Sequence, residues 1–216
     1  MVVCDGSNGA GKTTLIRNLR EHLRERGMDV VVTREPGGTP IGEKIREVLL
    51  SPETPEMCDL TELMLFGAAR AQHVREKILP ALEAGQVVLC DRFDSATISF
   101  QHYARGLDLS LVKNINALAL GEFRPDLYLI LDLDPEIGLE RVQQRGGVLD
   151  RLEAEQLAFL RRAREGYLAQ AEQEPQHFKV LQADRDEAAV TRDAIDLVEG
   201  LMLRMQPPSG GRRKDA

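Results

Sequence analysis

Cysteines, long apolar runs and a surplus of basic residues are all scarce or missing in this sequence. Its three cysteines, Cys4, Cys58 and Cys90, are widely spaced and odd in number. This pattern argues against a disulfide framework or a cysteine-ligated metal, and favours reduced thiols in a cytoplasmic protein. No run of 18 apolar residues occurs, and the first residues show no basic stretch followed by an apolar block. We therefore expect neither a membrane span nor a secretory signal.

The charge balance is acidic, with 28 basic and 35 acidic residues and a net charge of −7. Proteins that coat nucleic acid are usually basic, so this balance argues against a polynucleotide partner. It is compatible with a small anionic ligand that a few local arginines hold. A composition of 43% hydrophobic and 29% charged residues is typical of a globular protein. We predict one domain over residues 1–205, whereas residues 206–216 have the composition of a disordered tail.

Short apolar runs alternate with segments of helical periodicity. The runs lie at residues 2–4, 29–33, 87–90, 127–131 and 178–181. Near-continuous apolar runs favour strands buried on both faces, and the alternation with helices predicts a doubly wound α/β fold. We expect a mostly parallel five-stranded sheet with helices on both faces. A glycine-containing charged segment at about residues 143–153 interrupts this rhythm, and it is either a plain loop or a mobile lid.

The pattern G-x-x-x-x-G-K-[ST] occurs in full between the first predicted strand and the first predicted helix. Glycines let backbone N–H groups approach phosphate oxygens, and the start of the helix adds further free N–H groups. Lys12 would supply a cation to the β and γ phosphates, and the Thr13 hydroxyl could ligate magnesium. The sequence therefore predicts a P-loop that binds a nucleoside triphosphate through Gly6, Ser7, Asn8, Gly9, Ala10, Gly11, Lys12, Thr13 and Thr14.

The P-loop alone does not determine the reaction, because motors, GTPases and small-molecule kinases share it. Asp91 and Arg92 directly follow the third predicted strand, and Arg34 follows the second. Ligands bind at the carboxyl edge of such sheets, so we expect Asp91 near the magnesium and both arginines on a phosphate or ribose. Phe66 and Arg70 share one helix face, where they could stack on a base and donate to its carbonyl. Taken singly, a surface salt bridge for either arginine and a core position for Phe66 stay open.

Together these segments resemble the thymidylate kinase family of the bacterial type, over nearly the whole chain. The combination of TREPGG with DRF is the most specific part of the resemblance. The matching segments are the P-loop, TREPGGT at 33–39, LFGAARAQH at 65–73, DRF at 91–93, Gln101 with Arg105-Gly106, FRPDL at 123–127 and RGGVLDR at 145–151.

The resemblance implies a P-loop NTPase fold and transfer of the γ-phosphoryl group of ATP to dTMP, with magnesium. By the family pattern, Phe66 stacks on thymine and Arg70 reaches its carbonyl edge. The remaining implied roles are Thr97 and Gln101 in the base pocket, Phe100 near the sugar, Arg34 and Arg92 on the acceptor phosphate, Thr13 and Asp91 at the metal, and Arg145 as the catalytic arginine of the lid. It also implies a homodimer packed through helical stretches at residues 60–74 and 96–120.

Two other functions remain open. The family usually has a carboxylate where this chain has Asn8, and a glycine-rich turn where it has His102-Tyr103. These differences would favour a related kinase that acts on a modified pyrimidine monophosphate or another small phosphate. The other alternative is a nucleotide-binding protein with little turnover. The presence of Lys12 and Arg145 weighs against it, because a binding module needs no lid arginine.

Overall fold

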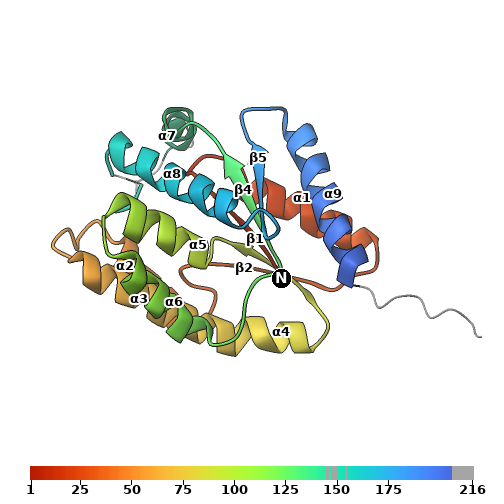
Figure 1. Ribbon diagram of the computed structural model, residues 1–216, viewed down its shortest axis with the longest axis horizontal. Coiled ribbons are helices and arrows are strands. Elements are labelled where there is room, and N and C mark those ends of the chain that lie inside the picture. The colour runs from red at the N-terminus through yellow and green to blue at the C-terminus, as the bar shows by residue number, and fades with distance from the viewer. Residues whose placement is uncertain (145, 147–149, 154, 206–216) are drawn as a thin grey trace, which may run out of the picture.

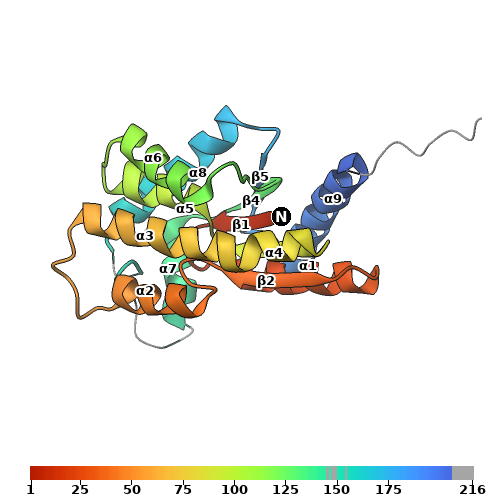
Figure 2. The ribbon, with the colours of Figure 1, turned by 90° about the horizontal axis from the view of Figure 1, so that it is seen from below.

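Five parallel strands form the centre of the protein, which we describe from a computed structural model for residues 1–144, 146, 150–153 and 155–205. The strand order is β2-β3-β1-β4-β5. The sheet and its helices are shown in Figure 1 and, after a quarter turn, in Figure 2. The strands are β1 (Val2–Gly6), β2 (Val30–Arg34), β3 (Val87–Asp91), β4 (Leu127–Asp132) and β5 (Phe178–Gln182).

All five predicted strands are confirmed to within one or two residues, and so is the parallel, doubly wound arrangement. The helices are α1 (Lys12–Glu25), α2 (Pro40–Leu50), α3 (Asp59–His73), α4 (Leu79–Glu83), α5 (Asp94–Thr97), α6 (Leu109–Leu120), α7 (Pro135–Gln144), α8 (Leu157–Gln173) and α9 (Glu187–Met205), with π-helical turns η1 (Val74–Ile78) and η2 (Ile98–Ala104). Sequence periodicity did not reveal the two π-helical segments, because their apolar spacing differs little from that of an α-helix.

The sheet has a hydrophobic core on each face. On one face Leu19 and Leu23 of α1 pack with Ala194 of α9 against the alternate residues of the strands. On the other face, residues of η1 and α8 such as Ile78 and Tyr167 pack against the opposite set. Figure 1 shows α1 and α9 side by side, away from α8. Burial on both faces explains why β1 and β4 are apolar along almost their whole length.

The strand register brings the carboxyl ends of the central strands to one edge. Asp91 pairs with Cys4 of β1 and with Arg34 of β2, and Gly6 pairs with Leu131 of β4. The P-loop and the segments that follow β2 and β3 therefore start beside one another. Within the described residues, no helix has both the length and the apolar character needed to cross a membrane.

Candidate active site

The P-loop has the backbone conformation that its glycines permit. Gly6, Gly9 and Gly11 have φ values of 125°, 74° and 95°, which side chains rarely allow. The loop also packs tightly against its neighbours. A Cβ atom on Gly6 would lie 2.3 Å from the carbonyl oxygen of Leu131, and one on Gly9 would lie 2.3 Å from that of Gly138 in α7. The glycines thus serve both the turn and the close contact with β4 and α7.

Lys12 is folded into the P-loop. Its Nζ atom donates to the carbonyl oxygens of Ser7 at 2.8 Å and Gly6 at 3.2 Å, and the residue is only 8% exposed. Burial, with the nearby Arg92 guanidinium, lowers the pKa of Lys12 from 10.5 to about 8. The loop therefore holds a poorly solvated cation that an anionic ligand would stabilise.

Arg92 lies at the end of β3 in an unusual backbone conformation, with φ at 66°. Its Nη1 atom donates to the Gly6 carbonyl oxygen at 3.0 Å and to the Tyr167 hydroxyl oxygen at 2.9 Å, and its Nη2 atom donates to Asn8 Oδ1. The guanidinium also lies over the ring of Phe100, 5.2 Å from the ring centre. A residue other than glycine in this left-handed backbone conformation is strained, so the surrounding contacts must hold it in place.

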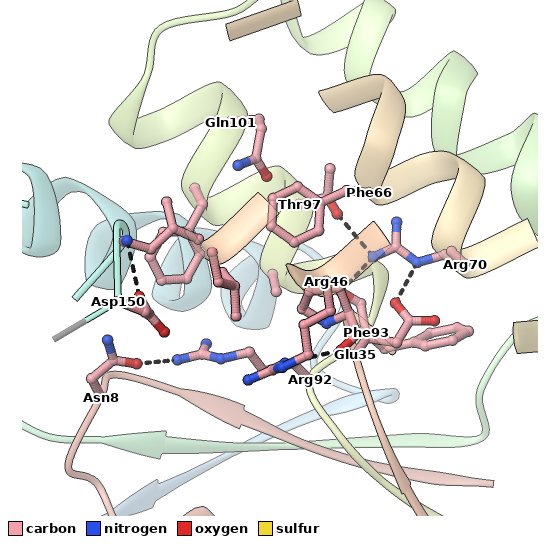
Figure 3. Close-up of a pocket in the computed structure, with 15 residues that line it drawn as sticks. Asn8, Glu35, Arg46, Phe66, Arg70, Arg92, Phe93, Thr97, Gln101 and Asp150 are labelled. Atoms are coloured by element: carbon pink, nitrogen blue, oxygen red, sulfur yellow. Dashed lines mark hydrogen bonds and ion pairs between the residues drawn. The ribbon is translucent and has the colours of Figure 1, made fainter. Parts of the chain in front are cut away.

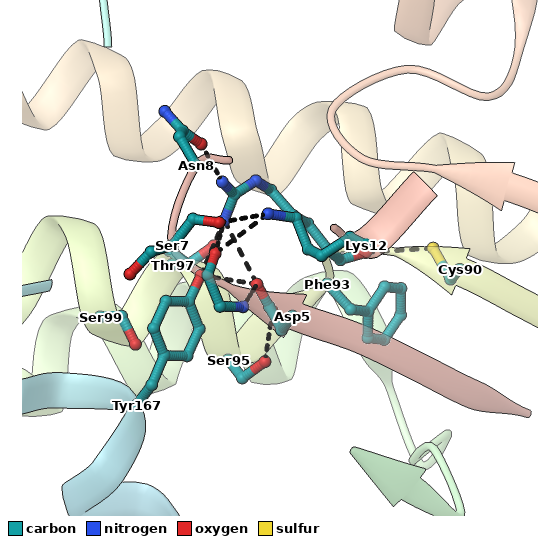
Figure 4. Close-up of polar contacts among 12 residues, drawn as sticks. Asp5, Ser7, Asn8, Lys12, Cys90, Phe93, Ser95, Thr97, Ser99 and Tyr167 are labelled. Carbon is teal, nitrogen blue, oxygen red and sulfur yellow. Dashed lines mark hydrogen bonds and ion pairs between the residues drawn. The ribbon is translucent and has the colours of Figure 1, made fainter. Parts of the chain in front are cut away.

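Asp5 is the buried anchor of these contacts, and Figure 4 shows the network around it. Its Oδ1 atom accepts from the Tyr167 hydroxyl at 2.6 Å and from Arg92 at 3.3 Å, and its Oδ2 atom accepts from Ser95 at 2.7 Å. Burial and the Asp5 charge raise the pKa of Tyr167, so its hydroxyl keeps its proton. Sequence reasoning missed Tyr167 and Ser95, because no local motif marks a tyrosine 162 positions from its aspartate partner.

A pocket opens beside the P-loop, between α2, α3 and the continuous helical stretch formed by α5 and η2. Figure 3 shows its lining. The lining residues are Asn8, Glu35, Pro36, Arg46, Leu50, Phe66, Arg70, Arg92, Phe93, Ala96, Thr97, Phe100, Gln101, Asp150 and Leu152. The pocket thus brings together Phe66, Arg70, Arg92, Thr97, Phe100 and Gln101, all of which were predicted to bind the acceptor.

Arg70 is almost fully buried at one side of this pocket and is held rigidly. Its Nε atom donates to Glu35 at 2.8 Å and its Nη1 atom to Asn116 at 2.7 Å. Its Nη2 atom donates to the Phe93 carbonyl oxygen at 3.1 Å and to the Thr97 hydroxyl at 2.9 Å. These four bonds leave one of the five guanidinium N–H groups for a ligand.

Two arginines differ from the sequence prediction in whether they line this pocket. Arg34, expected on the acceptor phosphate, does not line this pocket but forms a 2.8 Å salt bridge with Glu43. It lines a separate groove together with Thr13 and Asp91. Arg46 of α2 lines the pocket instead, and donates to the Pro36 carbonyl oxygen at 2.9 Å. The predicted lid arginine, Arg145, lies outside the described residues.

A further groove adjoins the start of α1 on the other side of the P-loop. Its lining includes Gly11, Thr14, Arg141 and Arg185. Arg141 of α7 donates to the Gly9 carbonyl oxygen at 3.3 Å, so this groove is continuous with the phosphate loop. Sequence reasoning did not single out Arg141, because it follows no recognisable motif.

The fold and this site define a class of protein, the P-loop kinases of small phosphorylated acceptors. A glycine loop with a buried lysine adjoins a pocket rich in arginine, and Arg92 contacts both.

Comparison with known proteins identifies the family. The family model described as thymidylate kinase matches residues 4–194. The thymidylate kinase of Pelotomaculum thermopropionicum is 45% identical over 201 residues, covering 93% of both chains. That of Ectopseudomonas mendocina is 48% identical and covers 93% of this chain and 95% of its own. A crystal structure of thymidylate kinase from Ehrlichia chaffeensis superposes with a TM-score of 0.75 at 30% identity, covering 92% and 97% of the two chains.

This chain therefore belongs to the thymidylate kinase family. The expected activity, phosphorylation of dTMP to dTDP, is confirmed by this membership, and the two alternative functions lose their support.

Proposed function

We propose that the P-loop of this chain holds ATP while the pocket lined by Phe66 and Arg70 holds dTMP, and that the γ-phosphoryl group passes directly between them. The observation that carries this assignment is the position of Arg92. Its guanidinium lines the acceptor pocket and donates to Asn8 of the P-loop. One cation therefore contacts both binding regions, as in-line transfer between two neighbouring phosphates requires.

The donor side is supported by the loop and the groove beside it. The P-loop backbone and the first turn of α1 would bind the phosphates of ATP, with Lys12 on the β and γ oxygens. The groove lined by Thr14, Arg141 and Arg185 lies next to that turn and would take the nucleoside end of ATP. Arg141 and Arg185 could stack on a purine with their planar guanidinium groups.

Magnesium is the metal that we propose for this site. Thr13 and Asp91 line one groove, so a hydroxyl and a carboxylate oxygen are available there. This donor set fits magnesium, which usually binds one or two carboxylates together with substrate phosphates. Thr13 and Asp91 would hold the ion, which would supply positive charge to offset the negative charge of the phosphates.

On the acceptor side, each wall of the pocket offers a different contact. Phe66 is partly exposed and would stack on the base, while Arg70 and Gln101 face its polar edge. Arg92 and Arg46 would hold the phosphate of dTMP, and Asn8 could hydrogen-bond the sugar. The contact of Arg34 with the acceptor phosphate stays a prediction.

Catalysis in this arrangement needs no covalent intermediate and no dedicated base. The acceptor phosphate is already an anionic nucleophile, so positioning and neutralisation of charge provide most of the rate. Lys12 and Arg92 supply positive charge from the donor and acceptor sides. Arg145 stays a prediction, as the residue that would add a third cation when the lid closes.

We also propose a homodimer in the cytoplasm. Leu60 and Met64 of α3 and Leu118 of α6 are large apolar side chains that are 47%, 55% and 74% exposed. The helices α3 and α6 pack on one another, so these side chains belong to one helical layer that a second copy could cover. The three cysteines are unpaired, as expected in a reducing compartment. Sedimentation of the wild type against Leu118→Glu tests the dimer, because a charge there should yield monomers.

A coupled assay of ADP release tests the reaction. We expect ATP and magnesium to support rapid turnover with dTMP, and slower turnover with dUMP, UMP, dCMP, dGMP and 5-hydroxymethyl-dUMP. The variant Lys12→Ala serves as a control, since it should bind dTMP but lose turnover. A wild-type protein that binds ATP but phosphorylates another member of the panel faster than dTMP would overturn the assignment of the acceptor.

A further inference from the structure

A buried carboxylate stands directly behind the base-binding side of the acceptor pocket. Glu62 of α3 is 1% exposed and does not line the pocket itself. Its Oε1 atom accepts from the Gln101 side-chain amide at 2.8 Å and from Arg105 Nε at 3.2 Å. Its Oε2 atom accepts from Arg105 Nη2 at 3.1 Å and from Arg151. Three side chains thus donate to one carboxylate, two of them from η2 and its C-cap and the third from residue 151.

These contacts keep Glu62 ionised. Burial on its own would raise the pKa of Glu62, but hydrogen bonds from Arg105 and Gln101 and the charge of Arg105 outweigh it and lower the pKa. Two guanidinium groups within hydrogen-bond distance lead to the same conclusion from geometry alone. An ionised carboxylate accepts hydrogen bonds and has no proton to donate.

The orientation of the Gln101 amide follows from this charge state. The NH₂ group must face Glu62, since an amide oxygen there would oppose a carboxylate oxygen inside the protein. Gln101 is itself 1% exposed and lines the acceptor pocket, so its Oε1 atom is left on the pocket side. Figure 3 shows the end of this amide directed toward Phe66. Within the part of the chain that the structure describes, no donor occupies that oxygen.

The pocket lining therefore includes both an acceptor and a donor for the edge of a base. Gln101 Oε1 is the acceptor, and the remaining N–H group of Arg70 is the donor. Thymine and uracil carry a ring N–H next to a carbonyl oxygen, which complements this pair. Cytosine has a lone pair at the same ring nitrogen, so the Gln101 oxygen would oppose it.

We propose that Glu62 is a positioning residue for base selection, which acts by fixing the Gln101 amide so that its oxygen faces the base and favours thymine and uracil over cytosine. The proposal rests on the acceptor pocket assigned above. It differs from a purely structural role, in which Glu62 only joins α3 to Arg105 and Arg151. A structural role predicts a loss of stability or of overall rate, without a change in the preference between bases.

The test is the ratio of kcat/KM for dTMP to kcat/KM for dCMP, measured for the wild type and for Glu62→Gln. A side-chain amide at this position could donate to Gln101, which could then rotate and present its NH₂ group to cytosine. A site built to hydrogen-bond one substrate group discriminates strongly, so we expect a wild-type ratio above about 100 that falls roughly 10-fold or more in Glu62→Gln.

Arg105→Gln is the matched control. It removes one guanidinium from Glu62 but leaves an acceptor-only carboxylate that Arg151 still neutralises, so the ratio should stay within about twofold of the wild type. Glu62→Gln takes the carboxylate partner from two guanidinium groups, and the double variant Glu62→Gln/Arg105→Gln removes one of them. The double variant should show the same lowered ratio, and it replaces the single variant in the test if Glu62→Gln folds poorly. A wild-type ratio in either variant that carries Glu62→Gln, or an equal fall in Arg105→Gln, would overturn the proposal.

The wild type offers a further measurement, which needs no variant. With dTMP bound, NMR should show stronger contacts of the Gln101 amide protons with the Glu62 side chain than with the imino proton of the base; the reverse order would reject the proposal. The outcome is separable from that of the proposed function. A wild type without preference for dTMP would contradict the acceptor assignment, whereas a selective wild type with an equally selective Glu62→Gln would contradict only the role of Glu62.

Discussion

The buried ammonium group of Lys12 should make the P-loop less stable than it would be with an apolar side chain. Replacement by methionine keeps a long unbranched chain and removes the charge. The lowering of the Lys12 pKa from 10.5 to about 8 corresponds to a cost of about 3 kcal/mol for the charged form in the folded protein. Two hydrogen bonds to Gly6 and Ser7 are lost in exchange. We therefore expect Lys12→Met to raise the free energy of unfolding at pH 7 by about 1–3 kcal/mol.

The stability difference between Lys12→Met and the wild type should depend on pH. Below pH 8 Lys12 is protonated in both states, so the folded wild type carries the whole cost. Between about pH 8 and 10.5 the folded state releases this proton while the unfolded state keeps it. Because the unfolded state then binds more protons, the stability contributed by this group rises with pH in this window. The advantage of Lys12→Met should shrink accordingly and vanish near pH 10.5.

Urea unfolding of both proteins, followed by circular dichroism at pH 7 and at pH 10, measures the two free energies. Turnover should be lost in the variant at every pH, since the phosphates lose their cation. A variant that is less stable than the wild type at pH 7, or an advantage that does not shrink as the pH rises, would refute the reasoning from the buried cation. An active variant would refute the role of Lys12 in transfer.

Three further changes test the site by its packing and its contacts. Gly138→Ala places a Cβ atom 2.3 Å from the Asn8 carbonyl oxygen. Thermal unfolding should therefore show a free energy of unfolding lower by about 1–3 kcal/mol, and titration a weaker ATP affinity. An unchanged ATP affinity would contradict the close packing of α7 on the P-loop. Tyr167→Phe removes the hydroxyl between Asp5 and Arg92. It should raise the KM for dTMP about 10-fold while the KM for ATP stays constant. Equal effects on the two KM values would mean a general loss of structure. Phe66→Ala should weaken dTMP binding by about 1–3 kcal/mol in calorimetry through lost stacking, and unchanged binding would remove Phe66 from the base site.

The strands and the phosphate loop could be predicted from the sequence because each depends on residues that are close together along the chain. Five apolar runs between helical segments predicted the five strands, and the spacing of the glycines with Lys12 predicted the loop that the structure shows. The segment 65–73 and the DRF segment at 91–93 also predicted that Phe66 and Arg70 lie near Arg92. In each case, the residue types and their spacing along the chain were sufficient.

The sequence motifs did not indicate which arginine of this region lines the pocket. Arg34 lies in the TREPGGT motif, but its side chain leaves the pocket and pairs with Glu43. Arg46, one α2 residue among several charged ones, lines the pocket instead. Which arginine faces the pocket depends on how α2 packs beside α3, and no spacing within the sequence encodes that packing.

The sequence by itself therefore determined the class of fold, the phosphate loop and several of the residues that line the pocket beside it. Only the tertiary structure decided which way those side chains face and what holds them. Tyr167 reaches Asp5 across 162 positions, and Glu62 reaches Gln101 across 39. Local motifs arise from backbone conformation over a few residues, whereas buried hydrogen bonds form between helices that meet only after the sheet is assembled. The orientation of an amide in the pocket is thus a property of the folded chain.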